Sequence, residues 1–206
     1  YYRLRDSSYL PSPSLLLDID RLDRNIERVI EIAGSADRVW PHVKTHKSAE
    51  LTRRLMRRGF QRFKCSTIAE AEMLAGVEAP DVLVAYQLVG PNPARMAELA
   101  RRYSTTHFAA LIDDPGPLRA LSLAAVAAGV SIGVMLDVDL GMHRTGITPG
   151  EGAVALYSLI AKLPGVYPAG LHGYDGHNGQ SDRGERDAAC DEGTVAVKAL
   201  QSELEA

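Results

Sequence analysis

The chain has 206 residues, of which 46% are hydrophobic and 24% charged, a composition typical of a globular protein with one substantial core. Its formal net charge of −3 gives no reason to expect nucleic acid or an anionic membrane surface as a partner, and every apolar run is too short to span a membrane. Cys65 and Cys190 are too few for a disulfide framework, so we expect a reducing compartment and a cytoplasmic location.

The hydrophobic pattern alternates between strands and helices along the chain. Short apolar runs predict strands, and amphipathic segments that begin at a capping residue predict helices. Asp20 is the expected N-cap of the first helix, with Asp23 at the capping-box position, and Thr67 with Glu70 forms a capping-box signature for the third helix. In chain order, the predicted elements are a strand at 14–18, a helix at 20–33, a strand at 39–44, a helix at 49–58, a strand at 63–66, a helix at 67–75, a strand at 81–86, a helix at 93–103, a strand at 108–112, a helix at 117–128, a strand at 132–140, a helix at 151–163, a strand at 169–174 and a long helix from about 184.

Strands that alternate with helices at this spacing predict a parallel sheet with right-handed crossovers. The predicted fold is therefore α/β, a TIM-type (β/α)8 barrel, with a doubly wound sheet as the alternative. After the first strand, six strands of the barrel type can be counted, and six cannot close an eight-stranded barrel. We therefore expect residues 1–206 to form one barrel domain that lacks C-terminal sequence.

Strand alternation turns a set of polar side chains toward one interior. Successive residues of a strand point to opposite faces, and in a barrel the outward face packs under the helices and is apolar. In the first part of the chain, the inward residues are then Trp40, His42, Lys44 and His46. Lys47 falls on the opposite face, so Lys44 is the better candidate for a buried amine. In the last two strands, the inward polar residues are Asp137, Asp139, His172 and Tyr174.

Lys44 lies at the end of a predicted strand, with His42 and His46 two residues to either side. A lysine amine in a partly dry pocket can lose its proton and form an imine, and protonated histidines beside it would favour the neutral amine. Burying several charged groups without a function is costly. These residues therefore indicate an active site at the carboxyl ends of the strands, with a structural Lys–Asp pair as the alternative.

Four sequence blocks, in this order, resemble one enzyme family. PHVKTHK at 41–47 is the most specific block, DVDLGMHRTG at 137–146 is shared more widely with alanine racemases, and PSLLLD at 13–18 and GLHGYDGH at 170–177 complete the set. Together they resemble the D-threonine aldolase/D-serine dehydratase group of fold-type III pyridoxal-phosphate enzymes, which are relatives of alanine racemase. The resemblance implies a barrel that holds the cofactor and a C-terminal β-domain, which we do not find in this sequence.

The resemblance also implies roles for individual residues. Lys44 matches the lysine that forms a Schiff base with pyridoxal 5′-phosphate, Arg144 matches the arginine that contacts the pyridoxal 3′-oxygen, and Tyr174 falls where the family places a ring beside the pyridine. Asp137 occupies the place of a structural lysine in many alanine racemases, which argues against a plain alanine racemase. The expected catalytic residues are Lys44, His42 and Tyr174. The expected cofactor-binding residues are Lys44, Arg144, Tyr174, His172 and Asp137.

The implied activity is that of a lyase acting on D-3-hydroxy amino acids, by retro-aldol cleavage or by deamination of the D-serine dehydratase type. The alternatives are an amino-acid racemase, a non-catalytic pyridoxal-phosphate-binding protein of cofactor homeostasis, and a metal-dependent barrel hydrolase built on His42, His46, His172 and an aspartate. We expect no metal ligands in this chain, because the family's phosphate-binding loops and divalent-metal ligands lie further toward the C-terminus. The expected assembly is a homodimer in which the partner subunit completes the active site.

Overall fold

Five parallel strands form a single sheet in the computed structural model, which describes residues 6–205. Their order in space is their order in the chain, and every neighbouring pair is parallel. A doubly wound sheet reverses its strand order, whereas a barrel adds each strand beside the previous one. The barrel type of α/β fold is therefore confirmed, although the described strands leave the sheet open. The strands are β1 (Arg62–Cys65), β2 (Asp81–Gln87), β3 (His107–Ile112), β4 (Ile132–Val138) and β5 (Val166–Gly173).

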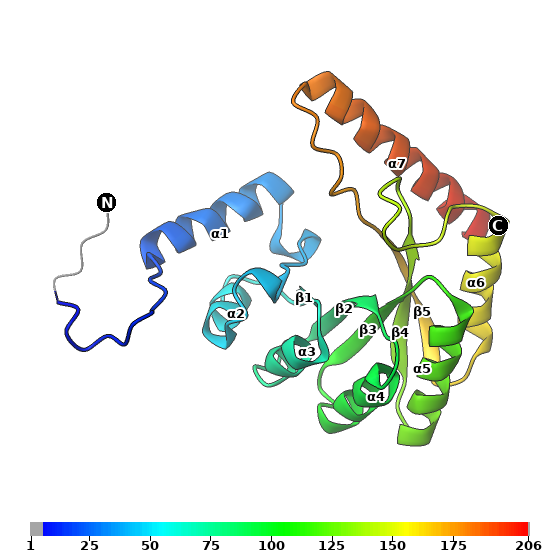
Figure 1. Ribbon diagram of the computed structural model, residues 1–206, viewed down its shortest axis with the longest axis horizontal. Coiled ribbons are helices and arrows are strands. Elements are labelled where there is room, and N and C mark those ends of the chain that lie inside the picture. The colour runs from blue at the N-terminus through cyan, green and yellow to red at the C-terminus, as the bar shows by residue number, and fades with distance from the viewer. Residues whose placement is uncertain (1–5, 206) are drawn as a thin grey trace.

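Helices connect the strands and cover one side of the sheet (Figure 1). The helices are α1 (Ile19–Ala33), the short η1 (Ala36–Arg38) and η2 (Val43–Thr45), α2 (Ala49–Met56), α3 (Ile68–Ala75), α4 (Asn92–Arg102), α5 (Pro115–Ala128), α6 (Glu151–Lys162) and α7 (Arg183–Glu205). Helix α3 contacts β1 and β2, α5 contacts β3, and α6 contacts β4 and β5. The predicted cap of α3 is present, since Thr67 Oγ1 accepts the backbone N–H of Glu70 at 3.2 Å. Within residues 6–205, every helix lacks the length or the apolar character that a membrane crossing needs.

Apolar residues on the helix-facing side of the strands form the core. Phe63 of β1 and Leu136 of β4 are fully buried in one cluster with residues such as Leu121 of α5. Burying a side chain of this size contributes about 1.5–3 kcal/mol. Because alternate residues of a strand point to opposite sides, this core fixes Lys64 of β1 and Asp137 of β4 on the other face of the sheet.

Residues 14–18 do not form the predicted strand. The segment is apolar, but no described strand pairs with it, and its three leucines are exposed. It leads directly into α1, whose N-cap is Asp18, because the Asp18 carboxylate accepts the backbone N–H of Arg21 at 3.0 Å. The predicted cap at Asp20 is therefore wrong by two residues.

Residues 39–44 do not form the predicted strand either. The backbone N–H of Lys64 donates to the Pro41 carbonyl at 2.9 Å, and His42 forms a single parallel bridge with Lys64. The chain then turns into η2, where His42 Nδ1 accepts the backbone N–H of Lys44 at 3.3 Å. A side-chain acceptor of this kind competes with sheet pairing for the backbone, so the segment meets β1 at one residue pair only.

Candidate active site

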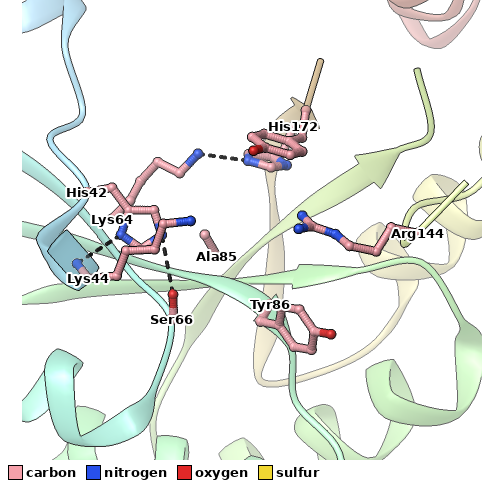
Figure 2. A pocket seen from close by; sticks show the side chains of 9 residues that line it. His42, Lys44, Lys64, Ser66, Ala85, Tyr86, Arg144 and His172 are labelled. Carbon is pink, nitrogen blue, oxygen red and sulfur yellow. Dashed lines mark hydrogen bonds between the residues drawn. The ribbon is translucent and has the colours of Figure 1, made fainter. Parts of the chain in front are cut away.

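A cavity of about 360 Å³ opens at the carboxyl ends of the strands (Figure 2). This is the end of a barrel at which enzymes hold their active sites. Its walls come from the segment before α2, from β1 and β2 near their ends, from the loop after β4, and from the end of β5. The lining residues are His42, Lys44, Lys64, Ser66, Ala85, Tyr86, Arg144, His172 and Tyr174.

Lys44 lines this cavity from η2, beside His42. In Figure 2 the side chains of Lys44 and Lys64 reach in from the same side, with Arg144 opposite them. Burial, together with the charges of the two lysines, lowers the pKa of His42 to about 4. His42 is therefore neutral at pH 7, so it does not supply the positive charge that we expected to favour a neutral Lys44.

A second lysine, Lys64 of β1, lies in the same cavity. Its Nζ is 3.0 Å from His172 Nε2, and His172 Nδ1 is 2.7 Å from Asp137 Oδ1. An ionised carboxylate only accepts hydrogen bonds, so His172 Nδ1 carries a hydrogen and donates a hydrogen bond to Asp137. Burial and then the charge of Lys44 lower the pKa of Lys64, whereas the Asp137 carboxylate raises it. The cavity therefore contains a lysine held by an oriented histidine.

Asp137 also connects the cavity to the loop after β4. Gln87 Nε2 donates to Asp137 Oδ2 and to Asp113 Oδ2, both at 2.9 Å. Asp113 Oδ2 in turn accepts the backbone N–H of Gly146 at 2.9 Å. Asp137 is only 3% exposed, and both of its oxygens have partners within the protein, as a buried carboxylate requires. Hydrogen bonds therefore run without a break from the cavity to this loop.

The loop after β4 holds Arg144 beside Tyr174. The Cζ atom of Arg144 lies 4.8 Å from the centroid of the Tyr174 ring. Asp139 Oδ1 accepts the backbone N–H groups of Gly141 and His143, each at 3.0 Å. Both hydrogen bonds lower the pKa of Asp139, and the bond from the His143 backbone N–H has the larger effect. Asp139, which we expected to face the interior, thus fixes the loop that carries the arginine.

Most of the predicted site residues meet at the cavity. Those that line it are Lys44, His42, Tyr174, Arg144 and His172. Asp137 lies beyond His172, to which it is hydrogen-bonded. The predicted inward direction is wrong for His46, whose Nδ1 accepts a backbone N–H of the α2 cap at 3.0 Å. Trp40 faces the interior as predicted, but it lines a second hollow near the amino ends of the strands, where the Arg62 Cζ atom is 5.6 Å from its ring.

Three residues that line the cavity were not predicted as site residues: Lys64, Ser66 and Tyr86. Phe63 and Cys65 are fully buried on the helix side, so alternation along β1 places Lys64 and Ser66 on the cavity side. The apolar pattern of this strand therefore contained the signal for both residues. Tyr86 comes at the end of an apolar strand, and its sequence context does not distinguish it from a core tyrosine.

Within residues 6–205, no three side chains of His, Cys, Asp or Glu lie close enough together to hold a metal ion. The hydrolase alternative, which needs a metal on His42, His46 and His172, has no support in this part of the chain. Divalent-metal ligands outside the chain stay a prediction.

Comparison with known proteins identifies the family. The family model described as the alanine racemase N-terminal domain matches residues 17–205. The chain belongs to this family. The 3-hydroxy-D-aspartate aldolase of Paracoccus denitrificans (strain Pd 1222) is 31% identical over an alignment of 206 positions that covers 96% of this chain and 53% of that protein. The D-threonine aldolase of Arthrobacter sp. is 31% identical over 166 residues, which are 80% of this chain and 43% of that protein.

Solved structures of this family share the fold. The crystal structure of D-threonine aldolase from Filomicrobium marinum matches 95% of this chain with a TM-score of 0.88 and 31% identity, and the match covers 53% of that chain. The resemblance drawn from the four sequence blocks is therefore confirmed at the level of the family. The chain spans about half the length of the curated relatives it matches.

Proposed function

We propose that the protein is a pyridoxal-phosphate-dependent lyase that acts on D-3-hydroxy amino acids. The observation that carries this proposal is the convergence of Lys44, Arg144 and Tyr174 on one cavity at the carboxyl ends of the strands. These residues come from segments far apart in the chain, and each matches a cofactor contact of the family that the sequence resembles. Two relatives that are 31% identical, a D-threonine aldolase and a 3-hydroxy-D-aspartate aldolase, favour a lyase over a racemase.

The residues of the cavity fit this cofactor in size and in chemistry. Small-molecule sites occupy roughly 300–1,000 Å³, and this cavity has about 360 Å³. Lys44 offers a primary amine, and the Arg144 guanidinium beside the Tyr174 ring offers a cation next to an aromatic surface. When bound, pyridoxal phosphate supplies an aldehyde that reacts with amines and a ring that stabilises negative charge on the substrate Cα.

The chain's own groups prepare this chemistry. Lys44 gives up a proton so that its nitrogen can react, and it takes up a proton when an incoming amine displaces it. His42, which is neutral at pH 7, accepts the Lys44 backbone N–H and so fixes the turn that presents the amine. Its Nε2 lies 3.4 Å from Ser66 Oγ, which orients the ring. Arg144 and Tyr174, which contact each other in the same cavity, would hold the cofactor together with Lys44.

We further propose that residues 1–206 form one cofactor-binding domain of a longer protein. Support comes from the relatives, of whose length the chain covers 43% and 53%. Residues that hold the cofactor phosphate and a divalent metal then belong to the part of that longer protein outside residues 1–206. A homodimer is supported by the family resemblance alone, and a cytoplasmic location by the two free cysteines.

Absorbance and product analysis of the whole purified protein test this function. We expect an absorption band at about 420 nm that borohydride removes. D-Threonine should be converted to glycine and acetaldehyde by an aldolase, or to ammonia and a keto acid by a dehydratase. Formation of L-allo-threonine, by inversion at Cα alone, would instead indicate a racemase, and a band without turnover would indicate a protein of cofactor homeostasis.

Two lysine variants sharpen this test. Lys44→Ala should lose both the band and the products, because it removes the amine that attaches the cofactor. Lys47→Ala is the matched control and should keep both, because Lys47 is exposed and its Nζ pairs with Glu70 at 3.3 Å. A Lys44→Ala protein that keeps the band would contradict the proposal.

A further inference from the structure

Lys64 is the cationic residue of the cavity for which the proposed function has no role. Lys44 is exposed, whereas Lys64 is partly buried, and both line the same small cavity. Two like charges in such a space repel each other, and the repulsion is relieved when one of the two amines is neutral. The more buried of the two amines, Lys64, is therefore the one whose neutral form is favoured.

The hydrogen bonds of Lys64 allow both protonation states. Because His172 Nδ1 donates to Asp137, Nε2 of the neutral ring presents a lone pair to Lys64 Nζ at 3.0 Å. Both an ammonium and a neutral amine can donate an N–H to that lone pair. In the neutral state, Lys64 keeps its own lone pair free for a proton from the cavity. The nitrogen thus stays in one position whether it is charged or not.

We propose that Lys64 exchanges a proton with Lys44, so that Lys64, His172 and Asp137 together prepare Lys44 to react with a carbonyl carbon. The inference rests on the proposed function, since it concerns the amine that attaches the cofactor. In the transfer, the Lys44 ammonium loses one N–H bond, the lone pair of Lys64 forms one, and no electrons are gained or lost. The reverse transfer protonates Lys44 when another amine displaces it. Lys64 acts through Lys44 and is a positioning residue.

The surroundings of Lys64 favour this role. Burial and the charge of Lys44 lower the pKa of Lys64, and the Asp137 carboxylate opposes that shift. The pKa of His42 is about 4, so this ring adds no charge at pH 7. The titratable and charged groups that face Lys64 are His42, Lys44, Tyr86, Asp137, Arg144, His172 and Tyr174.

The test is the rate at which methoxyamine displaces Lys44 from the cofactor of the holoenzyme, followed by stopped flow at about 420 nm. Methoxyamine is neutral at pH 7, so its nitrogen attacks without first losing a proton. A group of the pocket must then carry a proton from that nitrogen to Lys44 as Lys44 leaves. Lys64→Met should slow displacement about 100-fold, the lower end of a general acid–base contribution. Lys162→Met, at the exposed end of α6, is the matched control and should keep the native rate.

Two more readouts separate proton transfer from a merely structural role. In the native protein, the displacement rate should fall as the pH rises and Lys64 loses its proton. Asp137→Asn removes the carboxylate that raises the pKa of Lys64, so this fall should move to lower pH. In Lys64→Ala, a trimethylammonium buffer should restore the rate in proportion to its concentration, because it can donate a proton but cannot form an imine.

Each possible result either supports or overturns the proposed proton exchange between Lys64 and Lys44. A native rate and pH profile in Lys64→Met would overturn the inference. A slowed Lys64→Ala that does not respond to trimethylammonium, with an unmoved profile in Asp137→Asn, would assign Lys64 a structural role and overturn it as well. A native protein without a band at about 420 nm would instead contradict the proposed function, and this inference with it.

Discussion

His42 shows how burial and two neighbouring lysines decide the protonation state of one side chain. Its pKa is about 4 in the folded protein, against 6.5 for an ordinary histidine. The unfolded chain therefore binds a proton more readily than the native one between these values. His42 contributes stability that is fully present above about pH 6.5 and is lost as the pH falls toward 4.

Urea unfolding at a series of pH values between 4 and 7.5 measures this contribution. His42→Gln should flatten the pH dependence of the unfolding free energy in this range, because glutamine does not titrate. His107→Gln, which changes an exposed histidine near the amino ends of the strands, is the matched control. Equal pH dependence in the native protein and in His42→Gln would show that folding does not lower the pKa of His42.

Sequence periodicity located part of the site at the residue scale. Alternation along the later strands correctly placed Asp137 and His172 together, and the structure adds the hydrogen bond of 2.7 Å between them. The same alternation places Lys64 on the cavity side, but a lysine in a short strand resembles an exposed residue of an edge strand. Its distance to His172 depends on pairing between distant segments, which periodicity does not encode.

At the scale of an element, the loop after β4 depends on a glycine that no other residue can replace without strain. Gly146 has φ +97°, and a Cβ atom there would lie 2.6 Å from the backbone nitrogen of Asp139. Its N–H also donates to Asp113, so the loop cannot shift without breaking that bond. The backbone is thereby held where Arg144 can face the cavity.

Gly146→Ala should lower the free energy of unfolding by about 1–3 kcal/mol through backbone strain, with a further loss from the contact with Asp139. It should also weaken cofactor binding, because the displaced loop carries Arg144. Gly90→Ala is the matched control: Gly90 also has positive φ, +60°, but a Cβ atom there meets nothing within 4 Å. Urea unfolding and cofactor titration measure both effects, and equal losses in the two variants would contradict the role of this loop.

Caps and apolar runs predicted most elements, and the exceptions share one cause. Thr67 caps α3 as expected, and Gly129 ends α5 with φ +67°. The apolar runs at 14–18 and 39–44 do not become strands, because a strand needs a partner along its length and these segments have none or a single bridge. The local sequence indicates which segments can form strands, but pairing with a neighbouring strand in the folded sheet determines which of them do.

At the scale of the whole molecule, the order of the strands decides where the site is. Each strand is added beside the previous one, so the carboxyl ends of β1, β2, β4 and β5 and the loops after them surround one cavity. Residues as far apart in the chain as 42 and 174 thereby line one site, although no single sequence motif contains them. The chain covers about half the length of its relatives. The proposed function assigns the reactive amine and the ring contacts to this half and the remaining ligands to the other half.

The point of attachment of the cofactor is the most direct test of this assignment. The holoenzyme is reduced with borohydride and digested, and the peptide that carries the pyridoxyl group is identified by mass spectrometry. We expect the label on Lys44 in the native protein and also in Lys64→Met, since Lys64 acts only through Lys44. A label on Lys64 or on Lys47, or no label at all, would contradict the role of Lys44 as the reactive amine.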